Sequence, residues 1–132
     1  MKTININLNQ ILFVIVISFT LLISAGCHQK RPVDPRINII DLDLRNLISI
    51  DKLVTNLRSD GLRKMQVRGF NHSGNYMKLE YKAEWFDEMG MVIPSGMSIW
   101  TEFPAHKRSE FGFSLISPNP KAVDIRILIR RR

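Results

Sequence analysis

Residues 77–85 (MKLEYKAEW) alternate without exception between apolar and charged side chains. A period of two is typical of a β-strand that has one buried face and one face in water. These residues therefore predict a half-buried strand, and the fold must supply a core for one of its faces. We expect Trp85 in that core, because it shares the face of Leu79 and Tyr81, and we expect Phe86 to point outwards.

Further strands with turn signals between them are predicted along the rest of the chain. Residues 87–90 (DEMG) predict a turn, and shorter alternating runs predict strands over residues 65–70, 97–103, 109–116 and 123–129. A chain of 132 residues has room for one domain. The sequence thus predicts a mainly β fold, a small antiparallel β-sandwich.

Residues 49–61 leave the type of element open. Ile50, Leu53, Val54 and Leu57 fall at helical spacing, with Ser49 placed as a cap and Gly61 as a stop. A second early strand over the same residues is the alternative, and residues 39–48 could form a strand that leads into it. One short N-terminal helix is therefore an open element of the prediction.

The first 26 residues have the organisation of a secretory signal peptide. Residues 1–10 are polar with one positive charge, residues 11–23 (ILFVIVISFTLLI) are apolar, and residues 24–26 (SAG) are small. The apolar run is shorter than the roughly 20 residues that cross a bilayer core as a helix. We expect cleavage after residue 26, with a retained signal anchor as the alternative.

The only cysteine, Cys27, follows these small residues. Residues 24–27 (SAGC) resemble the lipobox of bacterial lipoproteins, although the pattern more often has leucine at Ser24. The resemblance implies that the Cys27 thiol carries a diacylglycerol and that the new amino terminus is acylated. His28, in place of the aspartate of lipoproteins retained in the inner membrane, implies the outer membrane. Each buried methylene contributes about 0.8 kcal/mol, so two or three acyl chains anchor a protein firmly.

Residues 28–37 (HQKRPVDPRI) are polar and contain Pro32 and Pro35. They predict an extended tether that reaches roughly 33 Å at most, at about 3.3 Å per residue. The predicted organisation is a signal peptide over residues 1–26, the lipidated cysteine and tether over residues 27–37, and a β-sandwich domain over residues 38–132.

Three stretches resemble one family: residues 80–90 (EYKAEWFDEMG), 98–111 (SIWTEFPAHKRSEF) and 117–129 (SPNPKAVDIRILI). They are similar to the YcfL family of small Gram-negative outer-membrane lipoproteins. The resemblance implies an immunoglobulin-like β-sandwich that faces the periplasm. It implies no reaction, because the family has no established activity. The lipobox serine and the arginine triplet at residues 130–132 depart from the family.

The formal net charge of +7 favours contact with anionic surfaces. The candidate contacts to anionic lipid, lipopolysaccharide or peptidoglycan are Lys107, Arg108, Arg130, Arg131 and Arg132. A merely solvated basic face is the alternative. Nucleic acid is a poor partner for a secreted lipoprotein, and no stacking aromatic residues accompany the basic clusters.

Candidate catalytic residues are few. Glu80 and Glu84 on one strand face would lie about 13 Å apart, whereas paired carboxylates in glycoside hydrolysis lie roughly 5 to 9.5 Å apart. The three histidines have no second ligand at metal-site spacing. Trp85 and Trp100 could form a binding patch, although core positions are the favoured interpretation. We expect no metal, no cofactor and no enzymatic activity.

These observations predict a non-enzymatic protein that is anchored to the membrane through Cys27 and presents a sheet face or edge to another component of the cell envelope, an envelope protein in the first place. Pairing at a strand edge needs no special side chains, so such a role leaves little trace in a sequence. Direct binding of peptidoglycan or lipopolysaccharide through basic loops is the alternative.

Overall fold

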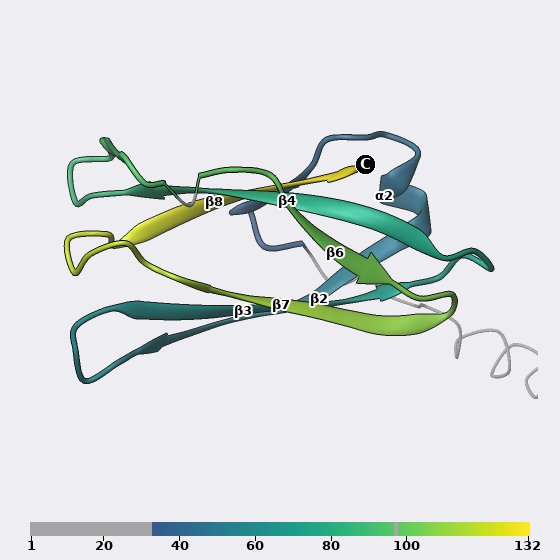
Figure 1. Cartoon of the computed structure of the whole chain (residues 1–132), viewed down its shortest axis with the longest axis horizontal. Helices are drawn as coiled ribbons and strands as arrows, with labels where there is room; N and C mark the ends of the chain where they lie inside the picture. Colours follow the sequence, from purple (N-terminus) through teal and green to yellow (C-terminus); the bar gives the residue numbers. More distant parts are fainter. Residues whose placement is uncertain (1–32, 97) are drawn as a thin grey trace, which may run out of the picture. The chain divides into compact units, whose positions relative to one another are not determined.

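The computed structural model of the chain describes residues 33–96 and 98–132 (Figure 1). The predicted signal peptide, Cys27 and residues 28–32 of the predicted tether therefore lie outside the described residues. The described chain forms eight strands and one four-residue helix, α2 (Leu44–Leu47).

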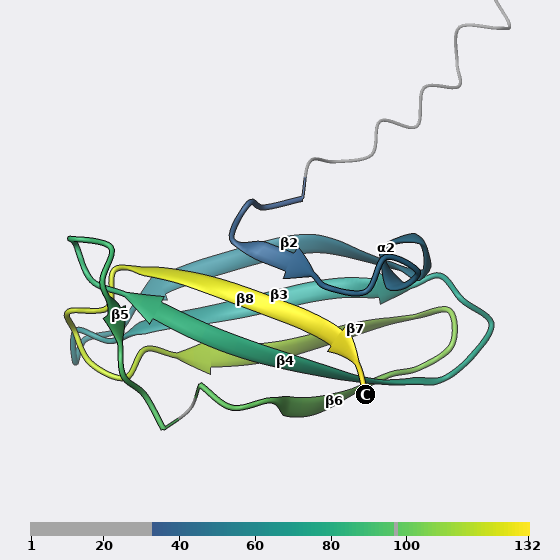
Figure 2. The same cartoon turned by 90° about the horizontal axis from the view of Figure 1, so that it is seen from above.

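The strands form two sheets that pack face to face (Figures 1 and 2). The larger sheet has the order β1 (Ile37–Ile39), β8 (Asp124–Arg131), β4 (Met77–Phe86) and β5 (Val92–Ile93), and β6 (Thr101–Ala105) also pairs with β4. The smaller sheet has the order β2 (Ile48–Leu57), β3 (Arg63–Asn71) and β7 (Ser109–Ile116). The predicted mainly β sandwich is confirmed.

The pairing is antiparallel except for β1, which runs parallel to β8. Ile37 lies opposite Ile127 and Ile39 lies opposite Ile129. A parallel pair needs a long crossover connection, and here nearly the whole domain lies between the two strands. Ile37, the last residue of the predicted tether, is therefore a buried residue of the sandwich.

The core lies between the inward faces of the two sheets. The alternation over residues 77–85 is realised in β4, where Leu79, Ala83 and Trp85 are buried. Ile125, Ile127 and Ile129 of the neighbouring β8 are buried beside them. The predictions that Trp85 is a core residue and that Phe86 lies on the opposite face are confirmed.

Residues 49–57 form a strand, so the helical alternative for residues 49–61 is wrong. The cause is a register shift between Ile50 and Lys52 in the pairing with β3. Ile50 lies opposite Gly69 and Leu53 opposite Val67, two β3 residues on the same face. An inserted residue of this kind changes the alternation of a strand. Two inward residues three positions apart therefore imitate the spacing of a helix.

The segment before β2 also differs from the expected strand over residues 39–48. The strand β1 ends at Ile39, and α2 follows after a turn. Leu44 is the buried residue of α2. The guanidinium of Arg45 donates to the carbonyl oxygen of Ile39 at 2.9 Å and holds the helix against the end of β1.

Candidate interaction surface

Four large apolar side chains are exposed on the segment that joins β4 to β6. Their exposed fractions are 85% for Met89, 63% for Met91, 56% for Val92 and 63% for Ile99. We call these four residues the methionine surface. The segment lies at the end of the sandwich away from α2 (Figure 2). Exposed apolar side chains that gather on one segment are typical of a site for another molecule.

The turn that carries Met89 and Met91 is held in one conformation by Asp87. The carboxylate oxygen Oδ1 of Asp87 accepts hydrogen bonds from the backbone N–H groups of Met89 at 2.9 Å and Met91 at 2.8 Å. Gly90, with φ of +78°, takes the left-handed conformation that the turn needs. The backbone of β5 then pairs Val92 with Phe86 of β4. The turn thus presents Met89, Met91 and Val92 of the methionine surface in a preformed shape.

The outer face of the larger sheet is a ladder of ion pairs. Glu84 on β4 lies 2.6 Å from Nη2 of Arg126 and 3.4 Å from Nζ of Lys82. Glu80 lies 2.8 Å from Nη2 of Arg130. The hydrogen bond from Arg126 is the main cause that lowers the pKa of Glu84, against the opposing effect of burial. Glu80 and Glu84 are thus bound to separate arginines, and this face is a solvated, charged one.

Trp100 lies outside the buried core. The guanidinium of Arg130 sits 3.9 Å from the centroid of its ring, and Arg126 sits 5.5 Å from the ring of Phe86. Cations at these distances are attracted to the faces of aromatic rings. The interpretation of Trp100 as a core residue is therefore wrong: the residue precedes β6, and its ring lies against Arg130 on the ion-pair face.

The predicted basic contacts gather at one end of the sandwich. The backbone N–H of Arg132 donates to the carbonyl oxygen of Lys78 on β4. Lys78 lies opposite Pro104 of β6, which is close in sequence to Lys107 and Arg108. Two of the five already have acidic partners, since Arg130 binds Glu80 and Arg132 binds Glu102.

Lys107 and Arg108 differ from the arginine triplet. Both are exposed in the turn between β6 and β7. Within residues 33–96 and 98–132, neither forms an ion pair. Arg108 has a φ of +47° and donates its N–H to Ser73 at 3.1 Å. Their charges therefore remain available to an anionic partner.

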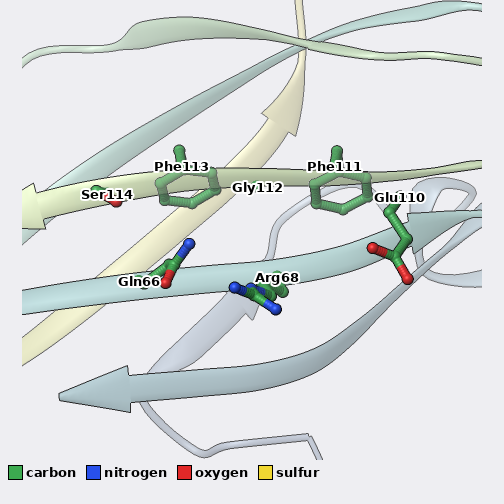
Figure 3. Close-up of a pocket in the computed structure, with 7 residues that line it drawn as sticks. All are labelled: Gln66, Arg68, Glu110, Phe111, Gly112, Phe113 and Ser114. Atoms are coloured by element: carbon green, nitrogen blue, oxygen red, sulfur yellow. The ribbon is translucent and has the colours of Figure 1, made fainter.

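A shallow hollow of about 310 Å³ lies over Gly112 on the smaller sheet (Figure 3). Gln66 and Arg68 of β3 and Glu110 and Ser114 of β7 surround it. The hollow exists because Gly112 has no side chain, and a Cβ there would meet the carbonyl oxygen of Val67 at 3.0 Å. It offers polar groups of both charges but lacks the depth of an enclosed site.

One serine–histidine contact was not anticipated from the sequence. Oγ of Ser49 lies 2.9 Å from Nε2 of His72 and 3.0 Å from Oδ1 of Asp51. In a nucleophilic triad the carboxylate accepts a hydrogen bond from the histidine. Here the carboxylate of Asp51 accepts a hydrogen bond from the Ser49 hydroxyl. Because the Ser49 hydroxyl donates its proton to Asp51, His72 is not placed as the base that would activate Ser49. The contact joins residues 23 positions apart, so only the pairing of β2 with β3 reveals it.

Among the described residues of the chain, no group of three or more His, Cys, Asp or Glu side chains could hold a metal ion. No helix of residues 33–96 and 98–132 is long and apolar enough to cross a membrane.

The fold and its surfaces define a small β-sandwich with an exposed apolar turn, an exposed basic turn and an open strand edge. The chain belongs to the DUF1425 family, described as a protein of unknown function, whose model matches residues 36–131. No curated protein sequence matches the chain.

Two solved structures share the fold. The crystal structure of Campylobacter jejuni cj0090 has a TM-score of 0.62 and 16% identity, over 75% of this chain and all of that one. A DUF1425 family member from Shewanella sp. pv-4 has a TM-score of 0.58 and 20% identity, over 64% of this chain and 78% of that one.

Proposed function

We propose that the protein is a YcfL-like lipoprotein, anchored through Cys27 in the outer membrane, whose sandwich binds another protein of the cell envelope without catalysing a reaction. The lipobox resemblance of residues 24–27 supports the anchor. The observation that supports the binding role is the methionine surface, whose residues Met89 and Met91 lie on a turn that Asp87 holds in place.

The methionine surface suits a protein partner for two reasons. Methionine side chains are flexible and polarisable, so they adapt to an apolar partner surface. The preformed turn lowers the entropy that must be lost on binding. Phe86, half-buried opposite Val92, extends the apolar area onto β4.

A photo-crosslinking side chain at Met91 in the full-length protein tests this proposal in living cells. We expect an adduct with a protein, because Met91 is exposed at the end of the turn, next to Val92 of β5. The same side chain at Lys78, an exposed position on the ion-pair face of β4, is the matched control. The double substitution Met89→Ser with Met91→Ser tests the same surface by loss of co-purification. An adduct equal at both positions, or with lipid alone, would contradict the proposal.

The anchor has a separate test. Cys27→Ser should abolish incorporation of a labelled fatty acid and shift the protein from the membrane fraction to the periplasmic fraction. Unchanged labelling or an unchanged membrane fraction would show that Cys27 is not the anchor. This result is independent of the partner, so the two parts of the proposal can fail separately.

Direct binding to lipopolysaccharide or peptidoglycan is the second candidate, favoured by the free charges of Lys107 and Arg108. Charge-driven binding of this kind weakens as salt screens the charges. Lys107→Ala with Arg108→Ala should then remove binding to purified envelope glycan at low salt. Binding of a protein through the methionine surface should change little when salt is added or when Lys107 and Arg108 are replaced.

A further inference from the structure

The edge of the smaller sheet at β2 is divided by its bulge. Near the bulge the strand carries Asp51 and Lys52, and charges and bulges are the devices that protect a sheet edge from pairing. Residues 53–57 (LVTNL) contain no charge and no proline. Val54 is 38% exposed and Leu57 is 60% exposed in this half. An uncharged apolar edge of this kind is a template for another strand.

The other edges of the sandwich are protected. On the larger sheet, β1 has three residues and β5 has two, and β6 carries Glu102 and Pro104. On the smaller sheet, β7 carries the charged Glu110 and lies beside β6, since the ring of Phe103 is 5.4 Å from that of Phe111 and 4.8 Å from that of Phe113. The uncharged half of β2 is therefore the edge that invites pairing.

The inner face of this half is also uncovered. Residues Leu53, Thr55 and Leu57 lie opposite Val67, Met65 and Arg63 of β3. Val67 and Met65 are buried, so these β2 side chains point to the same inner side. Thr55 and Leu57 are nevertheless exposed. A strand added beside β2 would bring its own side chains into this space.

We propose that the added strand is β2 of a second copy of this chain. Antiparallel pairing about Thr55 places Leu53 opposite Leu57 of the second copy, and Thr55 opposite itself. The inner row is then Leu–Leu, Thr–Thr and Leu–Leu, which are favourable cross-strand pairs. The segment is complementary to itself in this register, as a two-fold interface requires. The pairing joins two three-stranded sheets into one continuous sheet.

The charged residues at the ends of the paired segment determine whether salt strengthens or weakens the dimer. In the same register, Lys52 faces Arg58 of the second copy, and Arg58 also forms an ion pair with Asp60 at 2.8 Å. Like charges on opposite strands are destabilising. Salt screens this repulsion, so the dimer should become stronger as salt rises, whereas binding of an anionic glycan should weaken.

Cysteine crosslinking of the full-length chain tests the pairing and its register. Thr55→Cys places two thiols directly opposite each other, and cross-strand Cβ atoms in that position lie about 4.5–5.5 Å apart. Mild oxidation in cells should make the disulfide-linked homodimer the main species on a non-reducing gel. Asn56→Cys is the matched control, because residue 56 faces Val54 of the second copy and not itself. The unsubstituted chain reports any dimer that forms through Cys27.

A second variant confirms that the dimer depends on the edge. Leu57→Lys in the Thr55→Cys chain should remove the homodimer, and the exposure of Leu57 makes loss of the fold unexpected. Equal crosslinking of Thr55→Cys and Asn56→Cys, or none above the unsubstituted chain, would overturn the proposal. A crosslink of Thr55→Cys to a different protein would also overturn it. The methionine surface shares no residue with this edge, so the outcome leaves the proposed partner binding unaffected.

Discussion

At the scale of single residues, Asn71 organises the end of the sandwich near α2. Its side chain is fully buried, and Nδ2 donates to the carbonyl oxygens of Asn75, Ala105 and His106 at 2.9–3.0 Å. Oδ1 accepts from the backbone N–H and the hydroxyl of Ser73. One amide thus joins the β3–β4 turn to the β6–β7 turn that presents Lys107 and Arg108.

Asn71→Ala should lower the free energy of unfolding by about 1–3 kcal/mol, because buried carbonyl groups lose their donor. Asn71→Asp should cost more, since a carboxylate would face the same carbonyl oxygens. The urea midpoint measures both effects. Asn56→Ala, an exposed control on β2, should stay within about 0.5 kcal/mol of the unsubstituted protein. Equal midpoints for Asn71→Ala and Asn56→Ala would show that the network adds no stability.

Gly69 is the glycine of β3 that the packing requires. A Cβ at this position would overlap the carbonyl oxygen of Ser49 and lie 2.5 Å from Cζ of Phe111. Gly69→Ala should therefore destabilise the protein by about 1–3 kcal/mol through overpacking. Gly74→Ala is the matched control, because a Cβ there meets no atom within 4 Å and neither glycine has a positive φ. Equal thermal unfolding midpoints for Gly69→Ala and Gly74→Ala would contradict this account.

The ion pair of Glu84 makes a small part of the stability depend on pH. The pKa of Glu84 is lower in the folded protein than its ordinary value of 4.5, mainly because Arg126 donates to it. The folded state therefore binds fewer protons, so the stabilisation is complete above pH 4.5 and is lost as the pH falls through the folded pKa.

Arg126→Ala should lower the free energy of unfolding by about 0.2–1 kcal/mol at neutral pH, as is usual for an exposed pair. The difference from the unsubstituted protein should shrink well below pH 4.5, where Glu84 is protonated. Urea unfolding of both proteins at neutral pH and well below pH 4.5 measures this difference. A difference that is the same at both values would assign the effect of Arg126 to its contact with Phe86.

At the scale of elements, β2 shows how a bulge changes the spacing of inward residues, and so the secondary structure that the sequence predicts. The inward residues of this strand are three apart across the bulge and two apart beyond it. The same bulge separates a protected half of the edge from an uncharged one. Both the failure of the helical alternative and the proposed pairing with a second copy therefore come from one inserted residue.

At the scale of the whole molecule, the strand at the end of the chain is central in its sheet. The order of the larger sheet places β8 between β1 and β4. Pairing with β1 connects the first strand of the domain to the last. Contacts between residues so far apart in the sequence require the closure of a long loop, which slows folding.

Deletion of residues 124–132 should therefore abolish cooperative unfolding, because β1 and β4 both lose a partner and three buried isoleucines, Ile125, Ile127 and Ile129, are removed. Deletion of Arg132 alone is the control, since that side chain is exposed on the ion-pair face. Circular dichroism during heating measures the transition. A cooperative transition in the longer deletion would mean that the sandwich folds without β8.

Features that depend on neighbouring residues could be predicted from the sequence. The alternation over residues 77–85 decided the strand, its buried face and the place of Trp85, because side chains of a strand alternate whatever it pairs with. The turn at residues 87–90 was predictable for the same reason, since Asp87 and Gly90 act within it. Features that depend on distant residues appear only in the folded chain: the bulged β2, the parallel pairing of β1 with β8, and the arginines that bind Glu80 and Glu84. Such partners are selected by burial and backbone pairing across the whole chain, and no local pattern of residues encodes them.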